Sequence, residues 1–203
     1  MPPSPKALAH AERVFRQAGG ILRTRDALRR RIHPRTLYGL RDLDRLTSLG
    51  RGVWYLVDAP ASEHLDLIAV ALRYPRAVIC LTSALSWHGL TTQLPTRVHI
   101  ALPPGFPQPR TRFPPVRAFR FSGRAYTAGV ETHALPAATL RVYGVAKTVA
   151  DCFKFRNYVG LDVALEALRE GWRKRRFSMD ELWRSARICR VDRVMRPYLE
   201  ALV

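Results

Sequence analysis

Cysteine is scarce in this sequence of 203 residues, and the few cysteines exclude two kinds of site. Cys80, Cys152 and Cys189 are odd in number and far apart, and no Cys-x-x-Cys pair occurs. A disulfide framework needs paired cysteines, and a structural zinc site needs closely spaced ligands. The sequence therefore indicates neither. Cys80 and Cys152 have apolar neighbours and are interpreted as core residues.

Long apolar runs are also missing. No segment reaches the roughly 18 apolar residues of a transmembrane helix, and residues 1–5 contain no apolar signal core. We therefore expect a cytoplasmic protein that makes no use of a membrane.

Catalytic motifs are equally scarce. The sequence has no glycine-rich phosphate loop, no Gly-x-Ser-x-Gly and no His-Glu-x-x-His, and its histidines never pair at metal-ligand spacing. His88 is a candidate general base, although a structural or surface role is favoured. Asp151 and Lys154 are similar to the acidic-then-lysine end of some nuclease sites, but their spacing differs, and a local ion pair on a helix is favoured. We expect no catalytic residues, no metal and no cofactor.

Positive charge is what the sequence has in excess. Lysine and arginine number 34 against 16 aspartates and glutamates, which gives a net charge of +18, and only four of the 34 are lysines. Such an excess destabilises a compact chain through self-repulsion, so it points to an anionic partner, with nucleic acid first and an anionic membrane surface second. The arginine bias suits bidentate contacts to phosphate and guanine, and a GC-rich genome explains it equally well.

The first 60 residues have the pattern of a small domain of helices and a hairpin. We expect a helix over 6–18 that is stopped by two glycines, and a second helix over 25–31 with Thr24 as its N-cap. A third helix starts at Pro34 and buries Leu37, Leu40 and Leu43. A hairpin follows, with strands over 46–49 and 53–57 joined by a Gly-Arg-Gly turn.

This order of elements is typical of a winged helix-turn-helix, whose third helix enters the DNA major groove and whose hairpin forms the wing. Residues 1–60 carry twelve basic and five acidic side chains, a net +7. From the third helix we expect contacts to base edges or flanking phosphates, and from the second helix and the wing contacts to the backbone. The candidate DNA-binding residues are Arg23, Thr24, Arg25, Arg29, Arg30, Arg31, Arg35, Thr36, Tyr38, Arg41 and Arg51. The alternative is a small α+β domain that does not contact DNA.

Residues 61–203 have the pattern of a second, α+β domain. A helix over 63–73 precedes strand candidates at 77–81, 97–102, 116–121, 130–135 and 138–143. Helices over 146–158 and 161–172 follow, a third starts at a capping box of Ser178 and Glu181, and Pro197 opens or kinks the last. The predicted fold class is therefore α+β, with a winged helix-turn-helix over 1–60 and a mixed domain over 61–203 whose C-terminal part is helical.

The second domain is also basic, with 22 basic and eleven acidic residues, a net +11. Its densest basic run is Arg173, Lys174, Arg175 and Arg176, which is either a solvated turn between helices or a phosphate clamp. A proline-dense stretch over 103–115 holds Arg110 and Arg112 and is either a stiff loop, the favoured interpretation, or a segment that follows a phosphate backbone. Phosphate contacts spread over both domains predict DNA affinity that falls steeply with salt.

Several segments together give a family resemblance. They are RTRDALRRRIHPRTLYGL (23–40), RGVWYLVD (51–58), AVICLTSALSWHGLTTQLPTRVHIAL (77–102), VYGVAKTVADCFKFRNYVGLDVALEALRE (142–170) and RPYLEAL (196–202). With these segments the chain resembles the AbiEi family of antitoxins from bacterial type IV toxin–antitoxin systems, which act in abortive infection as a defence against phage. The segments at 77–102 and 142–170 are the most particular.

The resemblance implies a transcriptional repressor of its own operon. The N-terminal domain would bind inverted-repeat operator DNA with two protomers side by side, and the C-terminal domain would serve antitoxicity and assist DNA contact. The cognate toxin would be similar to a nucleotidyltransferase and would be counteracted without a stable complex. Two alternatives stay open, namely an enzyme that acts on nucleic acid and an antitoxin that neutralises its toxin by direct contact.

Overall fold

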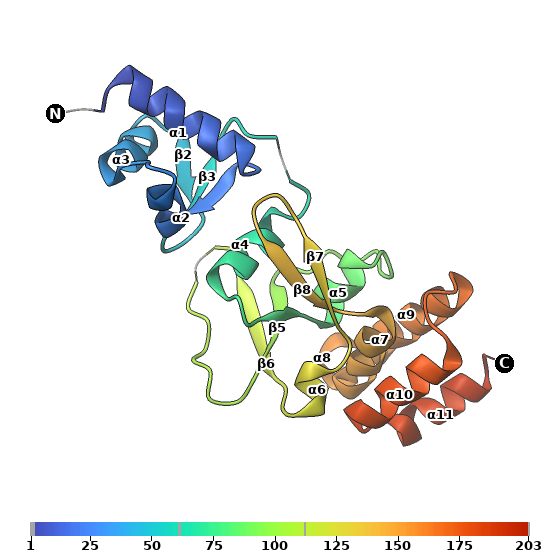
Figure 1. Ribbon diagram of the computed structural model, residues 1–203. Coiled ribbons are helices and arrows are strands. Elements are labelled where there is room, and N and C mark those ends of the chain that lie inside the picture. The colour runs from blue at the N-terminus through green and yellow to red at the C-terminus, as the bar shows by residue number, and fades with distance from the viewer. Residues whose placement is uncertain (1–2, 61, 112, 203) are drawn as a thin grey trace. The chain divides into compact units, whose positions relative to one another are not determined.

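The protein is a mixed α+β structure with two separate sheets, in agreement with the expected fold class. The computed structural model describes residues 3–60, 62–111 and 113–202, and Figure 1 shows the chain with its elements labelled. Contacts divide the chain into two compact units. The first unit comprises Met1–Pro75, Thr111–Pro114 and Ala134–Leu140, and the second comprises Arg76–Arg110, Pro115–His133 and Arg141–Val203.

Among its described residues, the first unit combines four helices with a three-stranded antiparallel sheet of order β1-β3-β2. Its elements are α1 (Pro5–Gln17), β1 (Ile21–Arg23), α2 (Thr24–Arg29), α3 (Pro34–Asp42), β2 (Leu46–Ser48), β3 (Val53–Leu56) and α4 (Leu65–Arg73). The expected helix from Pro34 and the expected hairpin are both present, and Gly50 and Gly52 in the hairpin turn have positive φ angles of 120° and 72°.

Both faces of this small sheet are covered, because successive strand residues alternate between its faces. On one face, Leu22, Trp54 and Leu56 pack into a core with residues of α1, α2 and α3. On the other face, Ile21, Leu49 and Val53 pack with residues of α4. By contacts, α4 therefore belongs to the first unit, although the expected domain boundary lies before it. The expected division into a DNA-binding domain over 1–60 and a second domain over 61–203 stays a prediction.

Two local expectations for the first unit are wrong. Thr24 is the first residue of α2 rather than its N-cap, which is Arg23, and α2 ends at Arg29. The regular spacing of Leu43 with Leu37 and Leu40 suggested a buried side chain. Leu43 lies just after α3 ends at Asp42 and is 56% exposed.

The second unit is built on a five-stranded mixed sheet of order β6-β5-β4-β8-β7. Its strands are β4 (Val78–Ile79), β5 (Val98–Leu102), β6 (Val116–Arg120), β7 (Val130–Ala134) and β8 (Thr139–Tyr143). Its helices are α5 (Leu81–Trp87), α6 (Arg124–Thr127), α7 (Val145–Lys154), α8 (Arg156–Val159), α9 (Leu161–Arg173), α10 (Met179–Cys189) and α11 (Asp192–Glu200). The neighbours of the central strand β4 are β5, antiparallel, and β8, parallel.

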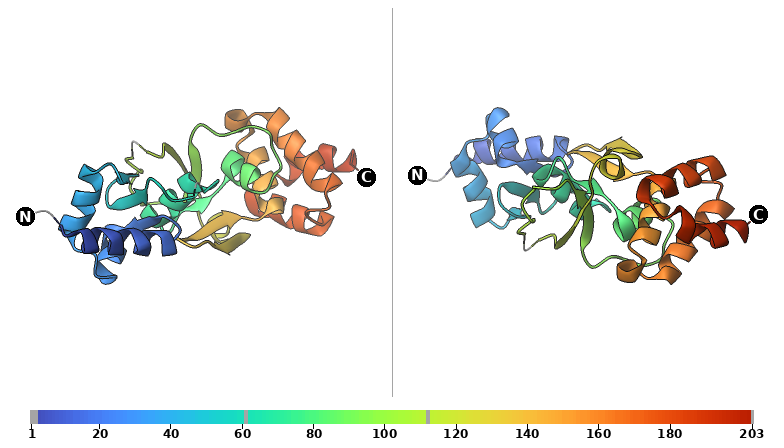
Figure 2. Two further views of the ribbon diagram at one scale, coloured as in Figure 1. Left: turned by 90° about the horizontal axis from the view of Figure 1, so that it is seen from above. Right: turned by 90° about the horizontal axis from the view of Figure 1, so that it is seen from below.

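Helix α7 is the centre of the second core. It contacts α5, α8, α9, α10 and α11, and its inner residues Val149, Ala150, Cys152 and Phe153 are fully buried. The views in Figure 2 show the C-terminal helices, in orange and red, gathered around one another at the end of this unit. The helical C-terminal part predicted from the sequence is therefore present.

The helix boundaries of the second unit agree with the sequence pattern in part. The capping box is confirmed, since the Glu181 amide donates to Ser178 Oγ at 3.2 Å and the Ser178 amide donates to Glu181 Oε2 at 2.8 Å. The expected helix over 146–158 is instead two helices, α7 and α8, separated at Phe155. Pro197 lies inside α11 rather than at its start. In the described part of the chain, no helix combines the length and apolar character needed to cross a bilayer.

Candidate nucleic-acid interface

Helix α3 presents a polar face whose side chains are exposed. Its inner residues Leu37 and Leu40 are buried, so the helix is fixed with Arg35, Tyr38 and Arg41 turned to solvent. His33 Nδ1 accepts a hydrogen bond from the Arg35 amide at 3.1 Å and thereby caps the start of the helix. These three side chains are accessible to a ligand, as the sequence predicted.

Thr36 is placed differently from the prediction. Its side chain is only 5% exposed and lies on the buried side of α3. A contact to a base edge requires a side chain that reaches into the groove. Thr36 is therefore a packing residue in this structure and is not placed to contact a base.

The exposed residues of α3 are held by aromatic contacts. The Tyr38 ring packs edge-on against the Trp54 indole, with 5.9 Å between ring centroids, and the Arg41 guanidinium lies 5.0 Å from the centroid of the Tyr38 ring. Arg41 also forms an ion pair with Asp42 at 2.8 Å. This pair reduces the local positive charge at the C-terminal end of α3, so Arg35 and Tyr38 are the stronger candidates for base contact.

The hairpin turn lies beside the start of α2. The Thr24 amide donates to the Gly52 carbonyl at 2.9 Å, and the Trp54 indole N–H donates to Thr24 Oγ1 at 2.9 Å. Arg51, in this turn, is exposed. The structure thus brings the predicted contacts at Thr24 and Arg51 together on neighbouring backbone segments, and the Thr24 hydroxyl already accepts one hydrogen bond.

The arginines on and around α2 have different surroundings. Arg25 and Arg29 both approach Asp26, at 3.5 and 3.7 Å, whereas Arg30 and Arg31 are exposed at the end of the helix. Burial and the neighbouring Arg25 lower the pKa of Arg23, which is half-buried at the end of β1. Asp26 therefore partly balances the positive charge of α2. The positive charges of Arg30 and Arg31, which follow the helix, are not balanced in this way.

The predicted basic cluster of the second unit is partly occupied by contacts within the protein. Glu170 forms ion pairs with Arg173 at 2.8 Å and with Lys174 at 3.3 Å. Lys174 also donates to the Gly89 carbonyl, and Arg176 donates to the His88 carbonyl. Arg175 is exposed, with a left-handed φ of 51°. Two of the four cations are thus paired with a carboxylate, which favours a structured turn over a dedicated phosphate clamp.

The proline-dense stretch contains the other two arginines predicted as phosphate contacts. Arg110 is exposed within that segment, and Arg112 lies outside the described residues. The described residues of 103–115 form neither helix nor strand, as expected for a loop.

A second group of cations was not singled out from the sequence. Arg124 on α6, Lys154 at the end of α7, and Arg184, Arg187 and Arg190 on and after α10 line a connected set of hollows. The spacing of Arg184 and Arg187 on one helix indicates a shared face. Nothing in the sequence indicates that Arg124 and Lys154 lie beside that face, because they come from elements far apart along the chain.

Asp151, one of the two weak catalytic candidates, makes contacts within the core. Asp151 is fully buried and receives two hydrogen bonds from Lys147 Nζ, at 2.6 and 2.7 Å, and one from the Cys189 thiol at 3.1 Å. The expected local ion pair of Asp151 is therefore made with Lys147 rather than with Lys154. Burial raises the pKa of Asp151, and the Lys147 ammonium opposes that shift.

His88, the other catalytic candidate, is also buried, and Cys80 and Cys152 are core residues as predicted. His88 is buried, its Nε2 donates to the Tyr143 carbonyl at 2.8 Å, and burial lowers its pKa. Burial raises the pKa of all three cysteine thiols, so they stay protonated. Across residues 3–60, 62–111 and 113–202, no group of three or more His, Cys, Asp or Glu side chains is arranged to hold a metal ion.

Comparison with known proteins gives a structural likeness without a family. No family model matches the chain, and no curated protein is similar enough to match. Among solved structures, the crystal structure of the RV2827C protein from Mycobacterium tuberculosis is similar, with a TM-score of 0.65. The likeness covers 91% of this chain and 72% of that one at 16% sequence identity. At this identity the likeness shows a shared fold.

Proposed function

We propose that the protein is a DNA-binding autorepressor and antitoxin of a type IV toxin–antitoxin cassette. The observation that carries the proposal is the face of α3, where Arg35, Tyr38 and Arg41 are exposed and Tyr38 packs against Trp54 of the hairpin whose turn presents the exposed Arg51. The order helix, helix, helix and hairpin supports a winged helix-turn-helix as the DNA-binding part. The segments similar to the AbiEi family support the toxin–antitoxin assignment.

In this proposal α3 enters the major groove and the hairpin follows the backbone. Arg35 and Tyr38 reach base edges, because arginine can donate two hydrogen bonds to guanine. Thr24, Arg25 and Arg29–Arg31 contact phosphates, and Arg51 anchors the wing. Asp42 and Asp44 follow on the C-terminal side, so this end of α3 faces away from the phosphates.

The operator and the assembly follow from the resemblance to the AbiEi family. A winged helix-turn-helix that binds inverted repeats needs two protomers, one on each half-site. The second unit serves the antitoxin activity and adds sequence-independent contacts to DNA. The toxin is similar to a nucleotidyltransferase and is counteracted in the cytoplasm without a stable complex.

Arg35→Ala is expected to weaken binding to the operator by about 1–3 kcal/mol and to leave binding to random DNA nearly unchanged. The reason is that Arg35 reads bases, while the other arginines hold phosphates. Gel-shift titrations on operator and random duplexes at one salt concentration measure both effects. Arg13→Ala, an exposed arginine of α1, is the matched control and should change neither affinity. Equal losses on the two duplexes would contradict the role given to Arg35.

A further inference from the structure

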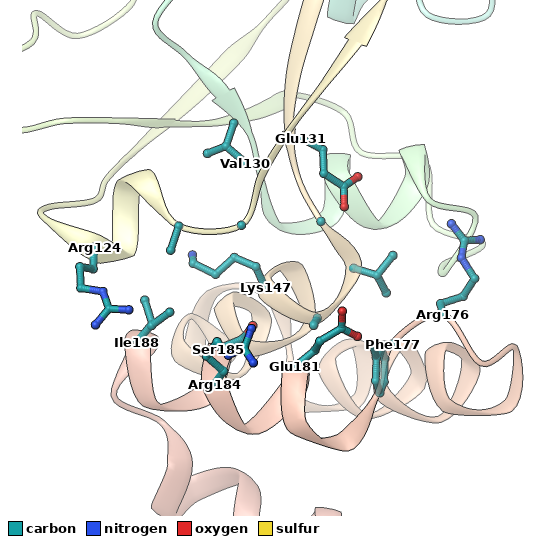
Figure 3. A pocket seen from close by; sticks show the side chains of 15 residues that line it. Arg124, Val130, Glu131, Lys147, Arg176, Phe177, Glu181, Arg184, Ser185 and Ile188 are labelled. Atoms are coloured by element: carbon teal, nitrogen blue, oxygen red, sulfur yellow. The ribbon is translucent and has the colours of Figure 1, made fainter.

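The second unit contains a pocket that the proposed DNA-binding function does not use. It has a volume of about 370 Å³, which lies within the range of small-molecule sites. Its walls come from the segment between α6 and β7, the start of α7, and α10, as Figure 3 shows. All of these elements belong to the second unit.

One part of the pocket combines carboxylates with apolar side chains. The carboxylates of Glu131 and Glu181 point toward one another from opposite walls (Figure 3). The Ser178 amide and hydroxyl lower the pKa of Glu181, so its carboxylate stays ionised and can only accept hydrogen bonds. Val145 and Phe177 line the same pocket, and so does Arg176, which donates to the His88 carbonyl. This part of the pocket suits a flat, largely apolar group that carries N–H donors on its edge.

The other part of the pocket is cationic. Arg124 and Arg184 line it, and both also line the neighbouring hollow that contains Arg187 and Arg196 together with the carboxylates of Asp180 and Glu200. A third hollow continues past Arg124 and Arg187 to Lys154 and Arg190. In the described part of the second unit, the ion pairs join Glu131 to His133, Lys147 to Asp151, and Glu170 to Arg173 and Lys174. The arginines of these hollows are not members of these ion pairs, and in the hollow with Arg187 four arginines face the two carboxylates of Asp180 and Glu200, which leaves a positive balance for an anion.

The floor of the pocket is closely packed. Lys147, which lines it, is 2% exposed, and its ammonium is fixed by Asp151 and by the Tyr143 ring at 4.1 Å from the centroid. Gly129 also lines the pocket, and a Cβ at this position would come within 2.9 Å of Lys147 Cβ. Buried contacts therefore hold the floor of the pocket in place.

We propose that this pocket binds a nucleoside di- or triphosphate, with the base between Glu131 and Glu181 and the phosphates on Arg124, Arg184 and Arg187. The base supplies N–H donors to the carboxylates and an apolar face to Val145 and Phe177. The phosphates supply the negative charge that the arginines match. A sugar phosphate would leave the apolar wall unmatched, and inorganic phosphate would leave the carboxylates unmatched.

Calorimetric titration of the full chain with GTP, ATP, ribose 5-phosphate and inorganic triphosphate tests the proposal. We expect at least one nucleoside triphosphate to bind at least about ten-fold more tightly than ribose 5-phosphate and inorganic triphosphate. Arg124→Ala and Arg184→Ala should each weaken nucleotide binding about ten-fold or more, because each removes hydrogen bonds to a charged group. Arg169→Ala, an exposed arginine of α9 outside the pocket, should leave it unchanged.

A further variant separates recognition of the base from recognition of charge. Glu131→Gln should weaken nucleotide binding and should not weaken binding of inorganic triphosphate. Circular dichroism confirms that each variant is folded. Equal affinity for nucleotide and inorganic triphosphate would overturn the proposal, as would unchanged affinity in Arg124→Ala and Arg184→Ala. Binding of a single-stranded oligonucleotide without binding of any mononucleotide would overturn it as well.

Discussion

Asp151→Ala is expected to lower the free energy of unfolding by about 3–5 kcal/mol. Asp151 is fully buried, and its two oxygens hold the ammonium of Lys147, which is also buried. Removal of the carboxylate leaves a positive charge in a low-dielectric interior with no partner of opposite sign. Urea unfolding followed by circular dichroism measures the change.

The double variant Lys147→Met/Asp151→Leu distinguishes the loss of a partner from the loss of packing. Apolar residues of similar size in place of a buried ion pair often leave stability nearly unchanged. The double variant should therefore be much more stable than Asp151→Ala. Glu166→Ala, a partly exposed acidic residue of α9, is the control and should change stability little. A double variant as unstable as Asp151→Ala would show that the charge of Lys147 is not the cause.

DNA affinity is expected to fall about a thousand- to a hundred-thousand-fold between about 50 and 200 mM salt. This range corresponds to about 6–10 phosphate contacts, each of which releases bound counterions when it forms. The first unit supplies candidate contacts from the exposed residues Arg30, Arg31 and Arg51 and from the partly balanced Arg25 and Arg29. Two protomers on one operator would double these five contacts and bring their number into the range of about 6–10.

A single phosphate contact has a measurable share of this salt dependence. Arg31→Ala should reduce the slope of log affinity against log salt by about one for each bound protomer, so by about two on the operator, and it should weaken operator and random DNA alike. Arg13→Ala should leave the slope unchanged. Fluorescence anisotropy over a salt series gives both slopes. A flat salt dependence for the unaltered protein would contradict a phosphate-binding role for these arginines.

The elements of the first unit could be predicted from local signals in the sequence. Pro34 begins α3, Leu37 and Leu40 give it an inner face, and the glycines around Arg51 mark the hairpin turn. Each signal concerns residues within a few positions of one another, where sequence pattern and backbone geometry are tightly coupled. The same holds for the capping box at Ser178, which the structure confirms.

Three side-chain environments differ from what the sequence pattern suggested. Thr36 is polar, yet it lies on the buried side of α3 next to Leu37. Thr24 accepts a hydrogen bond from Trp54, a partner thirty positions away. The sequence favoured Lys154 as the partner of Asp151, whereas Lys147 is the lysine on the inner side of α7. Thr36 precedes Leu40 by four positions and Lys147 precedes Asp151 by four, so helical spacing was available as a signal for these two, whereas the contact of Trp54 with Thr24 depends on tertiary packing.

The pocket of the second unit illustrates the same limit on a larger scale. Arg124, Glu131, Lys147 and Arg184 come from four separate elements and meet only in the folded chain. The sequence drew attention to Arg173–Arg176 because those cations are consecutive. Contacts with Glu170 and with backbone carbonyls occupy several of them.

A footprinting experiment on the DNA directly upstream of the protein's own gene tests the central claim most directly. The proposal predicts two protected segments related by inversion, about one helical turn or a multiple of it apart, at a protein concentration that leaves random DNA unprotected. Omission of Mg²⁺ should not alter the pattern. Uniform protection at all sequences would contradict the claim that α3 reads an operator, and Mg²⁺-dependent cleavage of the probe would contradict the assignment as a repressor.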